Sequence, residues 1–463
     1  MILAAVGVLA MFVLGWFPAA LVTRSPLWAT LTAPLATGVL AATWVSVMVL
    51  LRAPFTAVVG AVVVTSAACA IAVLRDRPRH LARPPKGWPW LLVVPAAGIA
   101  PLATVRLSPV AWDARSIWWF HARWFSAGGD ATVDALQHRV FGFAHQDYPP
   151  LASATTALGW WFTGSQPLRA AQIGTAVLTL SAVVTLGAVI WRLATPRLSA
   201  AGAALGALVV LAAYGVTGVG HSAPAVGPNG YVDLLQAAAL TAAAVALLVA
   251  PLEYDDATRI GALCLAVSAA TKNEGVVAAL VVGVIALVRA RARRRTVGWV
   301  AIAFVPAALW AVVLATVGVR SEADRQRIDE LLRLDRIVTD RFDPTIDALW
   351  DQMWPLLVAA LVVTAVGLVV FRGGARPSGT TTTASLWAVW GATSVALLLA
   401  YLVSSLPIGF HLVSSIDRAT IMPKLLLVAI VATWTVVGAL AIAERIASPA
   451  RGEQPVAGAI PIE

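Results

Sequence analysis

Long apolar runs, each about as long as a bilayer is thick, recur along this chain and restrict what it can fold into. A helix that crosses a membrane needs about 20 mainly apolar residues. About eleven runs meet this condition, at roughly 1–22, 30–51, 54–74, 89–105, 168–190, 199–217, 233–251, 297–317, 354–371, 384–404 and 420–443. Because 60% of the 463 residues are hydrophobic and only 12% are charged, the composition excludes a water-soluble enzyme or a disordered chain. The sequence therefore predicts an all-α, polytopic bundle of transmembrane helices.

Arginine clusters set the predicted orientation, because positive residues favour the cytoplasmic side of a membrane. The densest clusters begin at Arg75 and Arg289. We therefore expect the N-terminus outside and the C-terminus inside. The segments predicted to lie outside are 106–150, 218–232, 318–353 and 405–419. This arrangement accounts for the net charge of +10 without a nucleic-acid partner, and none is predicted.

Two short apolar stretches do not fit a simple series of crossings. The first, 149–163, is predicted to be a helix at the outer interface, with Trp160 and Trp161 at headgroup level. The second, 260–288, must leave and return to the cytoplasmic side. Two helices of about 13 residues would each rise only ~20 Å, less than the ~30 Å hydrocarbon core. We therefore expect a re-entrant hairpin with the sequence TKNEG, residues 271–275, at its tip.

These expectations divide the chain into six sections. N-terminal transmembrane helices (1–105) precede a large extracytoplasmic loop with juxtamembrane helices (106–166). Central helices with the hairpin (167–317) are followed by an extracytoplasmic amphipathic segment (318–353), the C-terminal helices (354–447) and a disordered cytoplasmic tail (448–463).

The first large outer loop contains most of the candidate polar residues. Asp113 is followed by Arg115, and the loop closes with His145, Asp147 and Tyr148. Asp113 could cap the helix that follows or serve as a general base that takes a proton from an acceptor hydroxyl. Asp147, before Tyr-Pro-Pro, could likewise cap a helix start or act as a second acid.

Ionisable residues also occur at or near membrane depth, where they are costly and usually either paired or functional. Lys272 and Glu274 stand in TKNEG, and a structural ion pair between them is the alternative to a binding role. Arg418, which follows His411 in IGFHLVSSIDR, could extend to lipid headgroups or hold a phosphate in a bidentate manner. We favour the phosphate.

Metal and redox chemistry have little support in the sequence. The histidines lack the spacing of common metal sites, so no metal ligand is assigned and no cofactor is required, although a divalent cation stays an open alternative. Both cysteines, Cys69 and Cys264, lie in apolar runs and are expected to pack as small hydrophobic residues.

The order of these motifs resembles the GT-C superfamily of polytopic glycosyltransferases, which use polyprenyl- or dolichyl-phosphate-linked sugars. The likeness extends over roughly residues 88–430 and is closest to the bacterial branch related to protein O-mannosyltransferases and aminoarabinose transferases, with a loop element like that of lipid-linked-oligosaccharide glucosyltransferases. It rests on Asp113, D-Y-P-P-L (147–151), G-Y-V-D (230–233), T-K-N-E-G (271–275) and H-L-x-x-S-x-D-R (411–418). Two departures stand out: a single acid in W-D-A-R replaces the usual acidic pair, and Tyr148 replaces a lysine.

The resemblance implies an inverting transfer of a sugar from a polyprenyl-phosphate donor to an extracytoplasmic glycan, lipid or protein acceptor. It assigns Asp113 as general base and Asp147 as the candidate second acid. Substrate contacts are expected from Arg115, His145, Tyr148, Asp233, Lys272, Glu274, His411 and Arg418. Membrane lipid would surround the bundle, and the active site would face outward from a bacterial cell membrane. The alternatives are a secondary transporter or lipid flippase and a non-catalytic assembly subunit, in which Asp113 and Asp147 would tolerate substitution.

Overall fold

In the computed structural model, every regular element of the described residues is a helix. These residues are 2–75, 109, 111–194, 199–216, 230–250, 255–290, 294–319, 338–370 and 380–447. Seven of the helices are long and apolar enough to cross a membrane, or eight if one bent pair is counted as a single span. The chain is thus an all-α, multi-pass membrane protein, as predicted.

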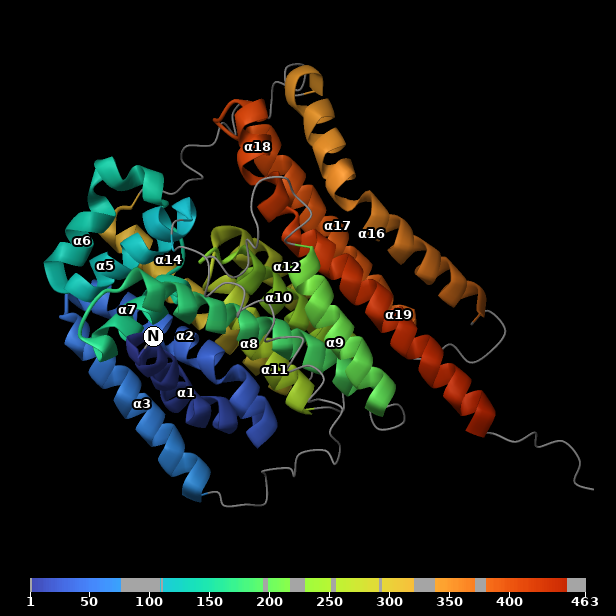
Figure 1. The fold of residues 1–463 in the computed structure, drawn as a ribbon, viewed down its shortest axis with the longest axis horizontal. Helices are drawn as coiled ribbons and strands as arrows, with labels where there is room; N and C mark the ends of the chain where they lie inside the picture. The colour runs from blue at the N-terminus through green and yellow to red at the C-terminus, as the bar shows by residue number, and fades with distance from the viewer. Residues whose placement is uncertain are drawn as a thin grey trace, which may run out of the picture.

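The N-terminal third begins with three long apolar helices, α1 (Ile2–Thr23), α2 (Pro26–Leu51) and α3 (Phe55–Arg75). Pro26 opens α2, where its missing N–H costs nothing. A buried hydrogen bond from Thr37 Oγ1 to the carbonyl of Met11, 2.6 Å long, links α2 to α1. The three helices lie together at one side of the molecule (Figure 1).

A layer of short helices follows, too short to cross a bilayer. It consists of the π-helical turn η2 (Ala114–Trp118), α5 (Trp119–Ala127), α6 (Gly129–Gln137), the 3₁₀ turn η3 (Arg139–Ala144) and α7 (Leu151–Thr163). The predicted helix at 149–163 is therefore present, and its 13 residues rise about 20 Å. Trp161 is 46% exposed, but Trp160 is buried and donates to the carbonyl of Pro167, so Trp160 packs inside the protein rather than among headgroups.

The centre of the molecule is built around α10 (Asp233–Ala244), which continues into the π-helical turn η4 (Val245–Val249). Every residue of these two elements is buried, as expected for a helix that is apolar on all sides. Around them pack α8 (Leu168–Ala194), α11 (Asp255–Ala269) and α12 (Asn273–Ala290), and α9 (Ser199–Gly215) packs against α8.

The helical hairpin predicted at 260–288 is formed by α11 and α12, with the TKNEG sequence at their turn. The helices contain 15 and 18 residues, so they rise about 22 and 27 Å and are longer than expected. Gly275 allows the close approach at the tip, because a Cβ there would lie 2.2 Å from the carbonyl oxygen of Ser268.

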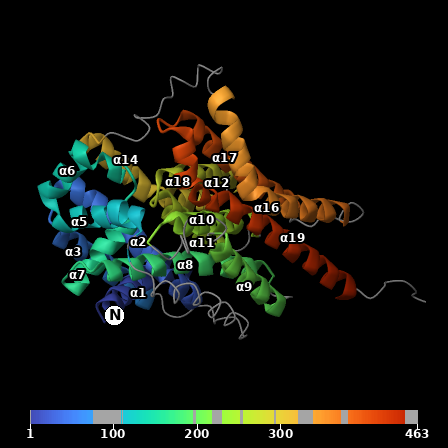
Figure 2. The ribbon, with the colours of Figure 1, turned by 45° about the horizontal axis from the view of Figure 1, so that its top comes forward.

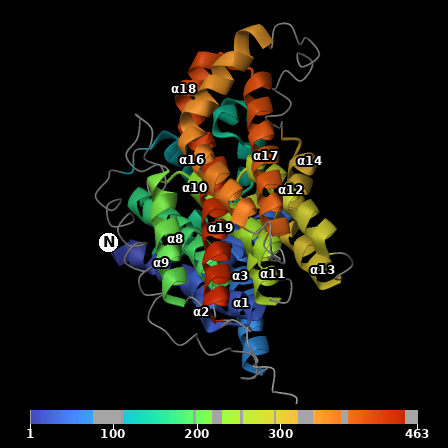
Figure 3. The same ribbon diagram turned by 90° about the vertical axis from the view of Figure 1, so that its right-hand side faces the viewer.

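The C-terminal helices form a separate group at the opposite side from α1–α3 (Figures 1 and 2). Before them come α13 (Arg294–Ala303) and α14 (Val305–Val317), which meet at a bend of 42°. The group contains η7 (Val338–Phe342), α16 (Asp343–Val370), α17 (Thr380–Val403), α18 (Ile408–Ala419) and α19 (Ile421–Ala447). In Figure 3, α16, α17 and α19 stand in front of the central helices.

Each predicted run that falls on described residues coincides with a helix or a joined pair, but not every one of these helices is long enough to be counted as a crossing. The helices at 199–217 and 233–251 are shorter than the seven or eight spans, and 89–105 lies outside the described residues. The helix that contains the run predicted from residue 354 begins earlier, because α16 starts at Asp343 and continues without a break. Most of the amphipathic segment predicted at 318–353, together with the tail at 448–463, lies outside the described residues.

Candidate functional site

An ion pair between Asp113 and Arg418 joins the first short-helix layer to the C-terminal helices. Asp113 directly precedes η2, and its carboxylate accepts a hydrogen bond from the guanidinium of Arg418 on α18. Asp113 makes no side-chain cap to its own helix, so the capping role considered from sequence is not adopted. Both side chains are largely buried, 18% and 21% exposed, which strengthens their attraction relative to a pair in water.

The segment before α10 lies against this ion pair. Arg418 Cζ sits 4.9 Å from the centre of the Tyr231 ring, a cation–π contact. Burial and the nearby Asp113 carboxylate raise the pKa of the Tyr231 phenol, against an opposing effect of Arg418, so the phenol stays protonated at neutral pH. Gly230, with φ of +91°, makes the approach possible, because a Cβ there would lie 2.5 Å from Trp119.

A second ion pair involves the first residue of α10 and the tip of the hairpin. Lys272 Nζ donates to Asp233 Oδ1 at 2.9 Å and lies 3.7 Å from Glu274 Oε1. Asp233 is 8% exposed and Glu274 is 52% exposed. The stronger partner of Lys272 is therefore Asp233, not the Glu274 that its sequence neighbourhood suggested.

Arg418 connects the two ion pairs electrostatically. Its charge interacts with Asp113 and with Asp233, and more weakly with Lys272. We call Asp113, Tyr231, Asp233, Lys272 and Arg418 the polar network. Its members come from four separate stretches of the sequence, and the longest link joins residues 305 positions apart.

The loop that closes with Tyr148 packs an aromatic stack beside this network. The Tyr148 ring stacks on Trp118 with centroids 5.5 Å apart and on His145 with centroids 4.6 Å apart. Lys272 Nζ lies 5.6 Å from the centre of the Tyr148 ring. Tyr148 therefore contacts a lysine supplied by the hairpin.

Asp147 is held by the hairpin tip. Its Oδ2 accepts a hydrogen bond of 2.9 Å from Asn273, and its backbone carbonyl accepts one of 3.0 Å from Trp310. The N–H of Leu151 donates to the carbonyl of Ala270. Asp147 is only 2% exposed. These contacts fix the loop against the hairpin, while Asp233 is the acid that shares Arg418 with Asp113.

His411 is linked to the polar network through Tyr401. Its ring centroid is 4.5 Å from that of Tyr401, and Tyr401 interacts electrostatically with Arg418, Lys272 and Glu274. The Tyr401 hydroxyl also shares a hydrogen bond of 2.9 Å with Ser415. Arg418 and His411 are thus brought to the same region by α18.

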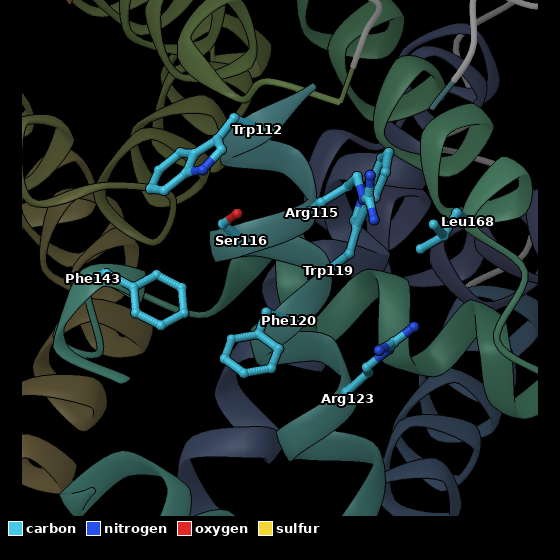
Figure 4. Close-up of a pocket in the computed structure, with 8 residues that line it drawn as sticks. All are labelled: Trp112, Arg115, Ser116, Trp119, Phe120, Arg123, Phe143 and Leu168. Atoms are coloured by element: carbon cyan, nitrogen blue, oxygen red, sulfur yellow. The ribbon is translucent and has the colours of Figure 1, made fainter. Parts of the chain in front are cut away.

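Arg115 is the predicted site residue that the structure places apart from the polar network. It lines a cavity of about 430 Å³ on the outer side of η2 and α5, together with Arg123 and several aromatic side chains (Figure 4). No group of three or more His, Cys, Asp or Glu side chains that could hold a metal ion is found in the described part of the chain.

Several residues of this site were not predicted from the sequence. Tyr231 stands inside the quoted G-Y-V-D motif and Asn273 inside T-K-N-E-G, so both were within motifs whose other members were assigned. Trp310 and Tyr401 lie inside long apolar runs, and nothing in their local sequence distinguishes them from the interface tryptophans and tyrosines.

Comparisons of the chain with protein-family models, with curated proteins and with solved structures found no match.

Proposed function

We propose that this protein is an inverting membrane glycosyltransferase that moves a sugar from a polyprenyl-phosphate donor to an extracytoplasmic acceptor. The observation that carries the proposal is the polar network, in which acids and cations from distant parts of the chain converge. Buried ion pairs are costly to form and contribute little to stability compared with apolar packing. Their concentration beside a loop that is itself rich in polar residues therefore favours chemistry.

The acids and cations of the polar network match the requirements of such a transfer. In the proposed step, an Asp113 oxygen takes the proton of the acceptor hydroxyl, and the acceptor oxygen forms a bond to the anomeric carbon. The bond from that carbon to the donor phosphate breaks on the opposite face. The electron pair leaves with polyprenyl phosphate, and the configuration at the anomeric carbon inverts.

Arg418 and Lys272 are the cations proposed to stabilise the leaving phosphate. A guanidinium carries five N–H donors, and Arg418 uses Nη1 for Asp113 and Nη2 for the carbonyl of Ser414. Its remaining donors suffice for phosphate oxygens while the contact with Asp113 persists. Cations fixed in a largely dehydrated site stabilise developing negative charge without reorganisation.

The acids would have distinct roles in this scheme. Asp113 is proposed as the base. Asp233 keeps Lys272 and Arg418 in place through direct and electrostatic contacts, so we propose it as a positioning residue. Asp147, bound to Asn273, would position the loop that carries Tyr148 and His145.

We further propose a GT-C type bundle in a bacterial cell membrane, with about eleven crossings and the polar network on the outer face. The support is that the predicted apolar runs in the described residues coincide with helices, seven or eight of them long enough to span a membrane, together with the motif order along the chain. The acceptor is proposed to be a cell-envelope glycan, lipid or protein.

The test is to incubate the purified protein, reconstituted in nanodiscs, with a panel of radiolabelled polyprenyl-phosphate sugars and an envelope extract as acceptor. Release of polyprenyl phosphate with an inverted glycosidic linkage in the product supports the proposal. A secondary transporter or flippase would instead move the intact donor across vesicle bilayers. Transport of intact donor without any cleavage would therefore contradict it.

A further inference from the structure

A cavity separate from the polar network lies along one face of η2 and α5. Its walls include Trp112, Arg115, Trp119, Phe120 and Arg123. These positions follow the i, i+3, i+7, i+8, i+11 pattern that places residues on one side of a helix. Figure 4 shows the side chains of Arg115 and Arg123 directed toward the same side of the cavity, while Phe120 and Phe143 stand on the other.

The two arginines of this cavity carry charges that the described part of the chain does not neutralise. Neither the Arg115 nor the Arg123 guanidinium has an ion pair or a hydrogen bond to another described residue. By contrast, Arg52, next to α6, pairs with Asp130 at 2.7 Å. Two planar guanidinium groups on one wall match the oxygens of a phosphate or carboxylate.

Aromatic side chains complete the cavity and are open to a ligand. Trp112 is 57% exposed and Phe143 is 49% exposed, with ring centroids 6.5 Å apart. Phe120 and Phe143 stack with centroids 6.0 Å apart. Aromatic faces bind apolar surfaces such as the C–H faces of a sugar ring, and a cavity of about 430 Å³ is within the usual size of small-molecule sites.

The cavity and the polar network meet at η2. Trp112, on the cavity wall, is the direct neighbour of Asp113. Trp119, also on the wall, lies against Gly230, the residue before Tyr231. A ligand in the cavity would therefore lie beside the helical turn next to Asp113, whose carboxylate pairs with Arg418.

We propose that this cavity binds the acceptor, and that the acceptor is a sugar bearing a phosphate or carboxylate group. Arg115 and Arg123 hold the anionic group, while Trp112 and the phenylalanines contact the ring. This assignment rests on the proposed glycosyl transfer for its role as acceptor site, but its ligand chemistry follows from the cavity itself. The same anion could belong to a soluble glycan or to a lipid headgroup.

Binding without any donor tests the cavity independently of catalysis. Saturation-transfer-difference NMR on the purified protein in phosphatidylcholine nanodiscs would compare glucose 6-phosphate with glucose. We expect clear binding of glucose 6-phosphate and at least tenfold weaker binding of glucose, with loss of at least tenfold in affinity for Arg115→Ala and Arg123→Ala. Arg115→Lys should retain part of the affinity, since lysine keeps the positive charge but lacks the planar arrangement of N–H donors. Arg52→Ala is the matched control and should bind normally.

Equal binding of glucose and glucose 6-phosphate, or unchanged affinity in both alanine variants, would overturn the proposal. Size-exclusion profiles and the partial retention in Arg115→Lys separate lost binding from misfolding. Adding phosphatidylinositol to the nanodiscs distinguishes the sources. If phosphatidylinositol displaces glucose 6-phosphate, the natural anionic group belongs to a lipid headgroup. If it does not displace glucose 6-phosphate, the anionic group belongs to a soluble glycan. Either result supports the site.

The failure of this inference is distinguishable from failure of the glycosyltransferase proposal. Asp113→Asn should bind glucose 6-phosphate as the wild type does, because Asp113 does not line the cavity. If sugar transfer is never found but the arginine variants lose binding, the transfer proposal and the acceptor role fail together, and the anionic-sugar site remains. If transfer depends on Asp113 but the arginine variants bind normally, the cavity assignment alone fails.

Discussion

Arg418, on α18, donates a hydrogen bond to the carboxylate of Asp113, which lies 305 positions earlier in the chain and directly before η2. The contact ties the helix that leads into α19 to the layer of short helices on the opposite side of the molecule. The same guanidinium lies over the ring of Tyr231, so one side chain connects three separate segments.

Replacing Arg418 should weaken donor binding. Arg418→Ala removes the guanidinium proposed to contact the donor phosphate and leaves Asp113 without its partner, so we expect at least about tenfold lower affinity for a polyprenyl-phosphate sugar. Arg418→Lys should recover only part of it, because lysine cannot form the two-pronged contact. Equilibrium binding of labelled donor in nanodiscs measures this, with Arg52→Ala as the control. Wild-type affinity and turnover in Arg418→Ala would show that Arg418 does not bind the donor phosphate.

The buried pair of Asp233 and Lys272 should show strong coupling in a double-mutant cycle. Asp233→Asn or Lys272→Met alone leaves one buried charge without its partner, which typically costs ~3–5 kcal/mol in unfolding free energy. The double variant should lose clearly less than the sum of the two, as measured by denaturant titration in detergent. The pair of Arg52 and Asp130 is 2.7 Å apart, with side chains that are 63% and 71% exposed, and it should show at most about 1 kcal/mol of coupling.

Additive effects at Asp233 and Lys272, no larger than those of the surface pair, would show that the two charges do not depend on each other.

Gly230 should not accept a side chain. Gly230→Ala places a Cβ 2.5 Å from Trp119 and 2.7 Å from Ala114, at a φ of +91° that alanine rarely adopts. We expect a lower thermal midpoint and, because Tyr231 and Arg418 lie next to it, reduced transfer. Gly391→Ala is the matched control, since a Cβ there meets no atom within 4 Å. Equal thermal midpoints for the two variants would mean that the segment can shift at no cost.

His121 should make the protein less stable in acid. Burial lowers the pKa of His121 from 6.5 to about 3, with a small opposing effect of the Ala144 carbonyl and a further lowering by His145. The folded state keeps this imidazole neutral, whereas the unfolded chain binds a proton below pH 6.5. Stability is therefore fully present above pH 6.5 and falls as the pH drops, by up to about 1.4 kcal/mol per pH unit.

Thermal midpoints between pH 5 and 8, roughly the range in which the unfolded-state imidazole titrates, would measure this slope. His121→Phe should flatten it, because phenylalanine preserves the packing against Trp124 without the titrating group. The exposed His138 provides the control, and His138→Gln should keep the wild-type slope. A slope that survives in His121→Phe would assign the acid sensitivity to another group.

The fold was largely accessible from sequence because it depends on apolar length. The runs that predicted crossings became helices, and the turn at TKNEG was placed correctly between α11 and α12. The run that predicted this crossing began only at 354, because Asp343, Asp347 and Asp351 precede it and were assigned to the amphipathic segment. A helix of 28 residues is about 42 Å long, which is longer than a bilayer core, so its polar first turns need not lie in the hydrocarbon.

Charged residues of the candidate site could be identified from the sequence, but their pairings could not. Asp113, Lys272 and Arg418 were identified because charges stand out in an apolar sequence. The pairing of each acid with its cation depends on how α10, α18 and the hairpin pack together. No local sequence pattern predicts that packing. Lys272 was therefore matched with Glu274, its neighbour, whereas its close partner is Asp233. The cavity at Arg115 was missed because its spacing along η2 and α5 was not read as one helical face.

Single-turnover sugar transfer by Asp113→Asn tests the central claim most directly. The variant should bind the polyprenyl-phosphate donor with near wild-type affinity, because asparagine keeps the size of the side chain, while the rate of transfer should fall by ~10²–10⁴, as expected for loss of a general base. Asp130→Asn, the partner of Arg52 at the surface, should transfer at the wild-type rate. Transfer by Asp113→Asn at the rate of the wild type would contradict the account.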